Sequence, residues 1–342
     1  ACFKKIWIYK LNFIIYLLGA FICGFCVCML NTVVNPMLNL LGGGGNKGNQ
    51  LIQTGGALNS LSGTLTPLFV GALIGTVTAQ TAMTDVAPLL FIAMGVFASA
   101  FIIISFIAIP EPHLRKGNVE KEKFAHSPWH FRHTLLGVVG IFIYVGIEIG
   151  IPGTLNFYLA DSSEKGAGLL VDGAAIGGAI SAIYWLLMLV GRSASSAISG
   201  KISSRTQLIV VSATAICFVL IAIITPKEVT LSMPGYSVDK GFQMAQVPVS
   251  ALFLVLCGLC TSVMWGGIFN LAVEGLGKYT AQASGIFMMM VVGGGVLPLV
   301  QQFISDAVGY MASYWLIIVL LAYLLFYGLV GCKNVNKDIP VE

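Results

Sequence analysis

The amino-acid sequence predicts an all-α membrane protein, and two observations lead to that fold class. The first is composition: 57% of the 342 residues are hydrophobic and 9% are charged, with a mean hydropathy of +0.91. Soluble domains, by contrast, carry charge on about a quarter of their residues. The second is that nine apolar runs come close to the roughly 20 residues that a helix needs to cross a bilayer. Together they predict a bundle of nine transmembrane helices.

One long hydrophilic stretch divides the nine predicted spans unequally. The first run has no small-residue cleavage pattern, so it is interpreted as a span and not as a signal peptide. Residues 111–133 contain five Lys or Arg residues and all four histidines, and we interpret them as a cytoplasmic linker after the third span. The spans are expected near residues 11–30, 57–79, 87–109, 134–159, 174–192, 206–224, 248–271, 282–305 and 312–331.

The distribution of basic residues predicts which ends of the spans are cytoplasmic. If the linker is cytoplasmic, alternation places most Lys and Arg of the shorter loops on its side, as is usual for cytoplasmic loops. Residues 333–342 are then a cytoplasmic tail of a multi-pass protein in the inner (cytoplasmic) membrane. The basic residues on the linker side are Lys47, Arg192, Lys201, Arg205, Lys278, Lys333 and Lys337, and those on the other side are Lys165, Lys227 and Lys240.

The beginning of the sequence departs from this pattern. Nine spans with a cytoplasmic C-terminus put Lys4, Lys5 and Lys10 outside. Both this anomaly and the unequal division disappear if three further spans precede the first residue, so we expect three plus six spans of a six-plus-six bundle. Residues 1–110 are then the remaining part of the N-terminal bundle, and residues 134–332 form the C-terminal six-helix bundle.

An internal repeat supports the division into two related halves. Residues 24–36, GFCVCMLNTVVNP, can be laid on residues 258–270, GLCTSVMWGGIFN, so that Asn31 matches Trp265. Further along each half, GTLTP resembles GGVLP. Parallel repeats of this kind are typical of transporters.

Other functional classes fit the residues poorly. A net charge of +4, with the basic residues between apolar runs, does not indicate nucleic-acid binding. Cysteines in the first and seventh spans have no histidine beside them, so we expect them to pack as small apolar residues and expect no metal or cofactor. The glycine run at residues 42–48 lacks the order of a phosphate loop and is interpreted as a turn. With every histidine in the linker and no aspartate well within a span, an enzyme is not expected.

One carboxylate, that of Glu148, lies well inside a predicted span. Ionisable groups at that depth usually serve a function, and Asn156 follows two turns later on roughly the same face. Pro152 and Gly153 lie between them and are expected to interrupt the helix, as in the discontinuous helices that border transporter sites. The alternative is that Glu148 is protonated or paired and only joins helices.

Uncharged polar and aromatic side chains recur in the other spans, beginning with the amide-rich stretch after residue 30. Amides bind hydroxyl groups and rings stack on sugars, so this composition favours a neutral hexose, although helix packing explains any single residue equally well. Arg192 and Glu274 are expected to pair as a gate at the cytoplasmic mouth. The candidate substrate-binding residues are Asn31, Asn59, Glu148, Asn156, Tyr184, Trp265, Asn270 and Gln301.

Several segments resemble the fucose and glucose/galactose permease family of the major facilitator superfamily. They are NTVVNPMLNLLG, ALNSLSGTLTPLF, YVGIEIGIPGTLNFYL, YWLLMLVGR and the stretch from MWGGIFNLAVEGLGKYT to SDAVG. The resemblance covers the chain from about Leu11 to Gly331. It implies a major facilitator type bundle of twelve helices in two halves, a central sugar site, alternating access and, in fucose permeases, proton symport. Matched to those members, this chain begins at about the fourth helix.

The resemblance also implies roles for single residues. Asn59 matches the asparagine of Gln-Thr-Phe-Asn-Ser in fucose permeases. Glu148 is similar to a glutamate in the seventh helix of glucose/galactose permeases, which makes it the candidate for proton coupling. Asn31 stands where fucose permeases have a glutamate, and an amide cannot take up a proton. Gly56 stands where that family usually has glutamine.

The sequence therefore predicts a monomeric permease of the lipid bilayer that carries a sugar of the fucose, galactose or glucose class, with protons as the candidate coupling ion. A sensor with a transporter fold, which binds sugar without carrying it, stays open as the alternative because it needs the same site.

Overall fold

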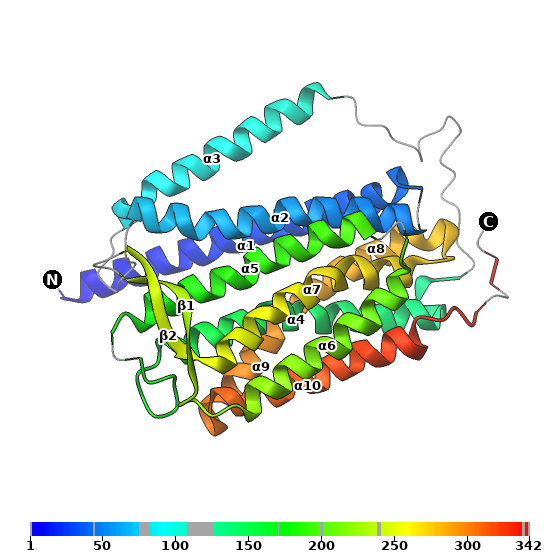
Figure 1. The fold of residues 1–342 in the computed structure, drawn as a ribbon. Helices are drawn as coiled ribbons and strands as arrows, with labels where there is room; N and C mark the ends of the chain where they lie inside the picture. The colour runs from blue at the N-terminus through cyan, green and yellow to red at the C-terminus, as the bar shows by residue number, and fades with distance from the viewer. Residues whose placement is uncertain are drawn as a thin grey trace.

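The computed structural model describes the chain in segments (Figure 1). Side chains are described over residues 14–43, 47–65 and 87–107 of the first three helices. The greater part of the predicted linker, together with Lys240 and Lys337, lies outside the described residues. The backbone is described for residues 2–43, 45–74, 83–107, 126–169, 171–198, 201–237, 241–336 and 339–340.

Helices make up nearly all of the described chain. Within a bilayer, backbone N–H and C=O groups must find partners inside the segment, and a helix satisfies them all. The helices are α1 (Cys2–Leu41), α2 (Gly45–Ile74), α3 (Met83–Phe106), α4 (Arg132–Ala160), α5 (Gly173–Ile198), α6 (Ser204–Ile224), α7 (Val249–Val273), α8 (Thr280–Met289), α9 (Gly293–Val308) and α10 (Tyr310–Phe326), with 3₁₀ turns η1 (Pro128–His130), η2 (Gly277–Tyr279) and η3 (Met290–Val292) and a π turn η4 (Tyr327–Gly331).

The predicted fold class is confirmed. Eight helical stretches of the described chain are long and apolar enough to cross a membrane, with η2 to α9 counted as one stretch. The second predicted span, 57–79, corresponds to α2 as far as residue 74, and residues 75–79 lie outside the described chain. The eight other predicted spans each coincide with one of these stretches.

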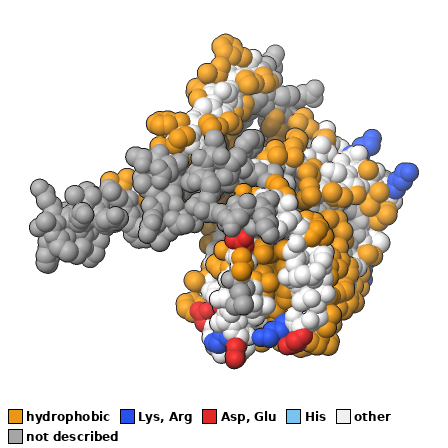
Figure 2. Space-filling model, turned by 60° about the vertical axis from the view of Figure 1, so that its left-hand side comes forward, with side chains coloured by type: hydrophobic (Ala, Val, Ile, Leu, Met, Phe, Trp, Pro, Cys, Tyr) orange, Lys and Arg blue, Asp and Glu red, His pale blue; other side chains and the backbone are white. Residues whose placement is uncertain are grey.

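Helix α4 is the centre of the bundle formed by α4 to α10, where it packs against α5, α7, α9 and α10. Helix α2 lies along α5 and α7, and α1 lies along α2 and α8. Helix α3 stands apart from the bundle (Figure 1). The large apolar side chains of α1 and α3 are exposed, and Figure 2 shows hydrophobic side chains over α3 and much of the visible flank. Such a surface suits contact with lipid tails.

Glycines allow close approach of α5 and α7. A Cβ at Gly258 of α7 would collide with the carbonyl oxygen of Tyr184 on α5, and one at Gly191 of α5 would collide with Ser262 on α7. Both positions therefore hold α5 and α7 together at backbone distance. This contact fixes the place of the neighbouring polar side chains.

The expected interruption at Pro152 and Gly153 is wrong, because α4 continues through both residues from Arg132 to Ala160. Proline removes only one helical donor and one bond of the ladder, and the Pro152 carbonyl accepts a hydrogen bond from Ser181 of α5 at 3.1 Å. The regular helix is lost instead at Met290–Val292, between α8 and α9.

A β-hairpin between α6 and α7 was not predicted. Strands β1 (Thr230–Ser237) and β2 (Gly241–Pro248) pair antiparallel. One face lies on α5, where Gly235 meets Ile176. The sequence signal was weak, because Pro and Gly interrupt the alternation that marks a strand.

The helix ends are arranged as the predicted alternation requires. The α1–α2 turn, the beginning of α4, the α5–α6 connection and the last described residues all lie at one end of the bundle, and the hairpin lies at the other (Figure 1). Described basic residues of the first end include Lys47, Lys201, Arg205 and Lys278.

Candidate functional site

The candidate site is built around an ion pair inside the bundle. Arg192 Nη2 of α5 lies 2.9 Å from Glu148 Oε1 of α4, and the two side chains are 7% and 13% exposed. Side chains on a helix lean toward its N-terminus. Arg192, placed six residues before the end of α5 at Ile198, therefore reaches back toward the middle of the neighbouring helix, where Glu148 lies.

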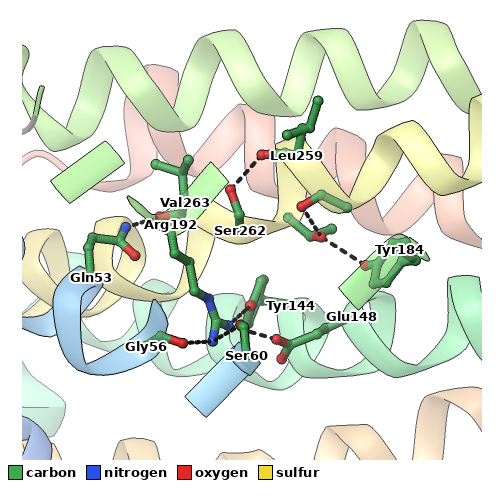
Figure 3. Close-up of polar contacts among 12 residues, drawn as sticks. Gln53, Gly56, Ser60, Tyr144, Glu148, Tyr184, Arg192, Leu259, Ser262 and Val263 are labelled. Carbon is green, nitrogen blue, oxygen red and sulfur yellow. Dashed lines mark hydrogen bonds and ion pairs between the residues drawn. The ribbon is translucent and has the colours of Figure 1, made fainter. Parts of the chain in front are cut away.

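The same guanidinium group also binds α2. Its Nη1 atom donates hydrogen bonds to the Gly56 carbonyl at 2.9 Å and to Ser60 Oγ at 3.0 Å, and Nη2 lies 3.4 Å from the Tyr144 hydroxyl of α4 (Figure 3). A Cβ on Gly56 would sit 3.2 Å from Arg192 Cδ, so glycine leaves room for the arginine. We refer to Arg192, Glu148, Tyr144, Gly56 and Ser60 as the Arg192 cluster.

An ion pair at this depth is weak evidence for a purely stabilising role. Removing two charges from water costs several kcal/mol per ion, and replacement of buried pairs by apolar residues is often neutral or stabilising. The cost is offset here by hydrogen bonds from one guanidinium to α2 and α4. Charges kept inside a membrane bundle at such cost usually mark a ligand or proton path.

Two further candidates lie beside the Arg192 cluster. The Trp265 ring of α7 packs on Tyr144 with 6.0 Å between centroids and remains partly exposed. Asn59 of α2 precedes Ser60 directly and is exposed. The Arg192 cluster is therefore bordered by an aromatic surface on α7, and Asn59 is the sequence neighbour of its α2 member Ser60.

Asn156 lies further along α4 from Glu148, toward the hairpin end. Its side chain packs against Gly177 of α5, where a Cβ would be 2.7 Å from Asn156 Oδ1. Among the described residues, that buried oxygen has no hydrogen-bond partner. A buried acceptor of this kind calls for a donor from water or a ligand.

Three further predicted site residues, Tyr184, Gln301 and Asn270, lie in contacts between helices. The Tyr184 hydroxyl is buried and bonds Thr261 Oγ1 at 2.8 Å. Gln301 of α9 is fully buried beside Gly150, on a different face of α4 from Glu148. Asn270 donates to Ser204 Oγ at 3.1 Å. The contacts of Tyr184 and Asn270 favour the packing interpretation that the sequence left open, whereas both amide atoms of Gln301 are buried without a hydrogen-bond partner among the described residues.

Asn31 is exposed on α1, and its carbonyl accepts a hydrogen bond from Asn35 Nδ2 at 3.1 Å. The described structure gives it no place in the Arg192 cluster.

The glycine-rich turn is shorter than residues 42–48, because α2 already begins at Gly45.

The predicted pair of Arg192 with Glu274 is wrong in this structure. Arg192 turns into the bundle to reach Glu148, whereas Glu274 follows the end of α7 with its side chain exposed. The Glu274 carbonyl accepts a hydrogen bond from His133 Nε2 at 3.0 Å. Its side chain lines a surface pocket of about 580 Å³ together with Arg205, Asn270, Lys333 and other residues of that end.

Sequence reasoning missed Tyr144 and the contacts that α2 makes beside it. Tyr144 lies four residues before Glu148, so helical periodicity alone places both on one face. Gln53 Nε2 of α2 donates to the Val263 carbonyl of α7 at 3.0 Å, and Thr54 Oγ1 lies 2.8 Å from Ser196 Oγ of α5. The described residues include no group of three His, Cys, Asp or Glu side chains that could hold a metal ion.

Comparison with known proteins gives a consistent family assignment. The family model described as Major Facilitator Superfamily matches residues 6–291. A glucose/galactose transporter of Brucella abortus biovar 1 (strain 9-941) is 31% identical over 322 residues, covering 93% of this chain and 72% of its own length. A putative glucose/galactose transporter of Helicobacter pylori (strain ATCC 700392 / 26695) is 28% identical over 344 residues, covering 93% and 74%.

A solved structure has the same fold. The crystal structure of the E. coli fucose:proton symporter FucP matches with a TM-score of 0.70 and 18% sequence identity, over 89% of this chain and 74% of that chain. The second half of this chain and the helices that precede it thus follow a known arrangement of membrane helices.

Proposed function

Because this chain belongs to the Major Facilitator Superfamily, we propose that it is a permease that carries a neutral hexose or deoxyhexose across the membrane by alternating access. One structural observation carries the proposal: a buried arginine–glutamate pair lies where α2 meets α4 and α5, beside the partly exposed ring of Trp265. The printed names of the relatives point to glucose and galactose as the first sugars to test.

The side chains around the Arg192 cluster can recognise a sugar through hydrogen bonds and ring stacking. Glu148 accepts and Asn59 both donates and accepts hydrogen bonds to hydroxyl groups. Trp265 offers a ring face to the apolar side of a pyranose. Asn156, with its buried free oxygen, is assigned the far end of the site. An uncharged ligand suits this set, since Arg192 already neutralises Glu148.

Alternating access requires that a contact between helices open and close. The contact of α2 with α5 and α7 suits this, because it includes polar side chains: Gln53 binds the Val263 carbonyl and Thr54 meets Ser196. Polar contacts of this type are exchanged for water with little net cost. In the proposed cycle, α2 separates from α5 and α7 after sugar binds.

Glu148 is the proposed proton-coupling residue. Among described residues it is the carboxylate placed at membrane depth beside the proposed sugar site. A proton on Glu148 would remove its charge and release one of the bonds that hold Arg192. The structurally similar fucose symporter is named for protons, which makes proton symport the coupling to test first.

The proposed setting is the inner membrane, with the C-terminus in the cytoplasm and the protein as a monomer. The excess of basic residues at the end of the bundle that holds the last described residues supports this orientation.

Counterflow tests the proposed function. Proteoliposomes are loaded with unlabelled sugar and diluted into labelled glucose, galactose, fucose or an amino sugar. We expect transient accumulation of at least one of the first three sugars. If no labelled sugar enters above the level of empty liposomes, the carrier function is wrong. Binding of a sugar without counterflow identifies the sensor alternative.

A further inference from the structure

Arg192 is the side chain that joins the proposed site to the movable helix contact. Its Nη2 atom binds Glu148 on α4, and its Nη1 atom binds Gly56 and Ser60 on α2. Within the contacts described, Glu148 and Ser60 do not meet, and each binds a different nitrogen of the guanidinium (Figure 3). One planar group thus has its two ends on two different helices.

We propose that Arg192 is a positioning residue that transmits the state of the Glu148 carboxylate to the α2–α5 contact. This inference rests on the proposed function, because it concerns the same site, and it assigns the step by which that site controls the helix contact. When the carboxylate is charged and free of ligand, it fixes the guanidinium plane so that Nη1 meets Gly56 and Ser60. When the carboxylate is neutralised, that constraint is lost and α2 is less firmly held.

The geometry suits this role because of the shape of arginine. A guanidinium is rigid and planar, so a rotation that ends the bond at one edge also moves the donors at the other edge. Gly56 contributes by leaving its carbonyl accessible and its Cβ space empty, with Arg192 Cδ 3.2 Å from the position a Cβ would take. Lysine, with its single rotatable ammonium, cannot bind both helices in this way.

The surroundings of the carboxylate are simple. Among described side chains, the charged or titratable groups around Glu148 are Arg192 of α5, Tyr144 of α4 and Tyr184, which lies eight residues before Arg192 on α5 with its hydroxyl bound to Thr261. Tyr144 touches the same Nη2 atom as Glu148. Both groups therefore act on one edge of the guanidinium, and α2 receives the opposite edge.

A cross-linking rate measures the effect without any need for transport. Cysteines replace Thr54 of α2 and Ser196 of α5, whose hydroxyl oxygens are 2.8 Å apart, in a background without the natural cysteines. Oxidation then reports how often α2 and α5 are in contact. Glu148→Gln and Ser60→Ala are each expected to slow the reaction about five- to tenfold, the change that corresponds to loss of a typical hydrogen bond.

The decisive result is non-additivity. The double variant Glu148→Gln, Ser60→Ala is expected to be no slower than the slower single variant. In an Arg192→Lys background, Glu148→Gln is expected to change the rate by less than about twofold, although lysine keeps the positive charge. Ser181→Ala, which removes an α5–α4 bond elsewhere, is the matched control and should leave the rate unchanged.

Two outcomes would overturn the inference: additive slowing by Glu148→Gln and Ser60→Ala, or an undiminished effect of Glu148→Gln in the Arg192→Lys background. If Arg192→Lys does not fold, Arg192→Met combined with Glu148→Gln removes both buried charges and provides the same comparison. A protein that fails counterflow but gives the non-additive pattern refutes the proposed function and leaves the transmission by Arg192 intact. A protein that shows counterflow but gives additive slowing refutes only this inference.

Discussion

Arg192 and Glu148 connect the end of α5 to the middle of α4 through a 2.9 Å ion pair that is almost completely shielded from solvent. The pair is also one of the places where α2 joins the rest of the bundle, because Arg192 donates to Gly56 and Ser60. A change at the carboxylate is therefore felt in both parts of the chain.

Glu148→Gln is expected to abolish uptake driven by a pH gradient while counterflow continues at a reduced rate, since glutamine still accepts a hydrogen bond but takes up no proton. The variant is also expected to unfold more easily. Loss of one partner of a buried pair costs about 3–5 kcal/mol, less where the amide still binds arginine.

The measurement is labelled-sugar uptake in proteoliposomes with and without an imposed pH gradient. Glu164→Gln, an exposed carboxylate in the loop after α4, is the control and should behave as the unaltered protein does. Gradient-driven accumulation by Glu148→Gln would remove Glu148 from the coupling mechanism.

Trp265→Ala is expected to raise the KM for the transported sugar about tenfold, because the ring supplies stacking area beside Glu148; a tenfold change corresponds to ~1.4 kcal/mol of binding. Trp265→Phe should have a KM between that of the unaltered protein and that of Trp265→Ala. Trp315→Phe on α10, where the ring is 53% exposed on the outside of the bundle, is the matched control. Equal KM values for Trp265→Ala and Trp315→Phe would contradict a role in sugar binding.

Cross-linking of Thr54→Cys to Ser196→Cys is expected to stop transport, since their hydroxyl oxygens lie 2.8 Å apart across the α2–α5 contact. A disulfide there holds closed the contact that must open in each cycle. The readout is counterflow before oxidation, after oxidation and after reduction, with each single cysteine variant as the control. Full counterflow by a fully cross-linked sample would show that this contact stays closed during transport.

Gly293→Ala is expected to destabilise the protein by about 1–3 kcal/mol, the usual cost of overpacking, because a Cβ at Gly293 would overlap the Phe142 carbonyl oxygen of α4. Gly295→Ala on the same helix has open space around its Cβ position. It should be neutral or gain about 0.5–1 kcal/mol from helix propensity. Thermal unfolding in one detergent compares the two; equal melting temperatures would contradict the described α4–α9 contact.

Hydrophobic length and composition were sufficient to predict the membrane helices, because these properties alone decide whether a segment can cross a bilayer. The predicted spans coincide with the described helical stretches even where boundaries shift, as for α1, which extends to Leu41. The hairpin was missed since its residues carry no strong strand pattern. The interruption at Pro152 was wrong because neighbouring helices support a proline inside a membrane helix.

The site was predicted in part. The depth of Glu148 in its span was readable from sequence, and so was the face that it shares with Tyr144. The partner of Arg192 was not, because the loops suggested an end-to-end contact with Glu274 while the side chain leans back into the bundle. The positions of Gln301 and Asn270 depend on which helix faces meet, and pairwise packing leaves no mark in a single sequence.

The most direct test is counterflow of labelled sugar by the double variant Asn59→Ala, Glu148→Gln, compared with Gln302→Ala on α9, where the Gln302 amide bonds Asp306 and not the Arg192 cluster. The account predicts that counterflow of the double variant falls to the level of empty liposomes at sugar concentrations that saturate the unaltered protein, while Gln302→Ala retains it. Unchanged counterflow by the double variant would place the sugar elsewhere and contradict a site at the Arg192 cluster.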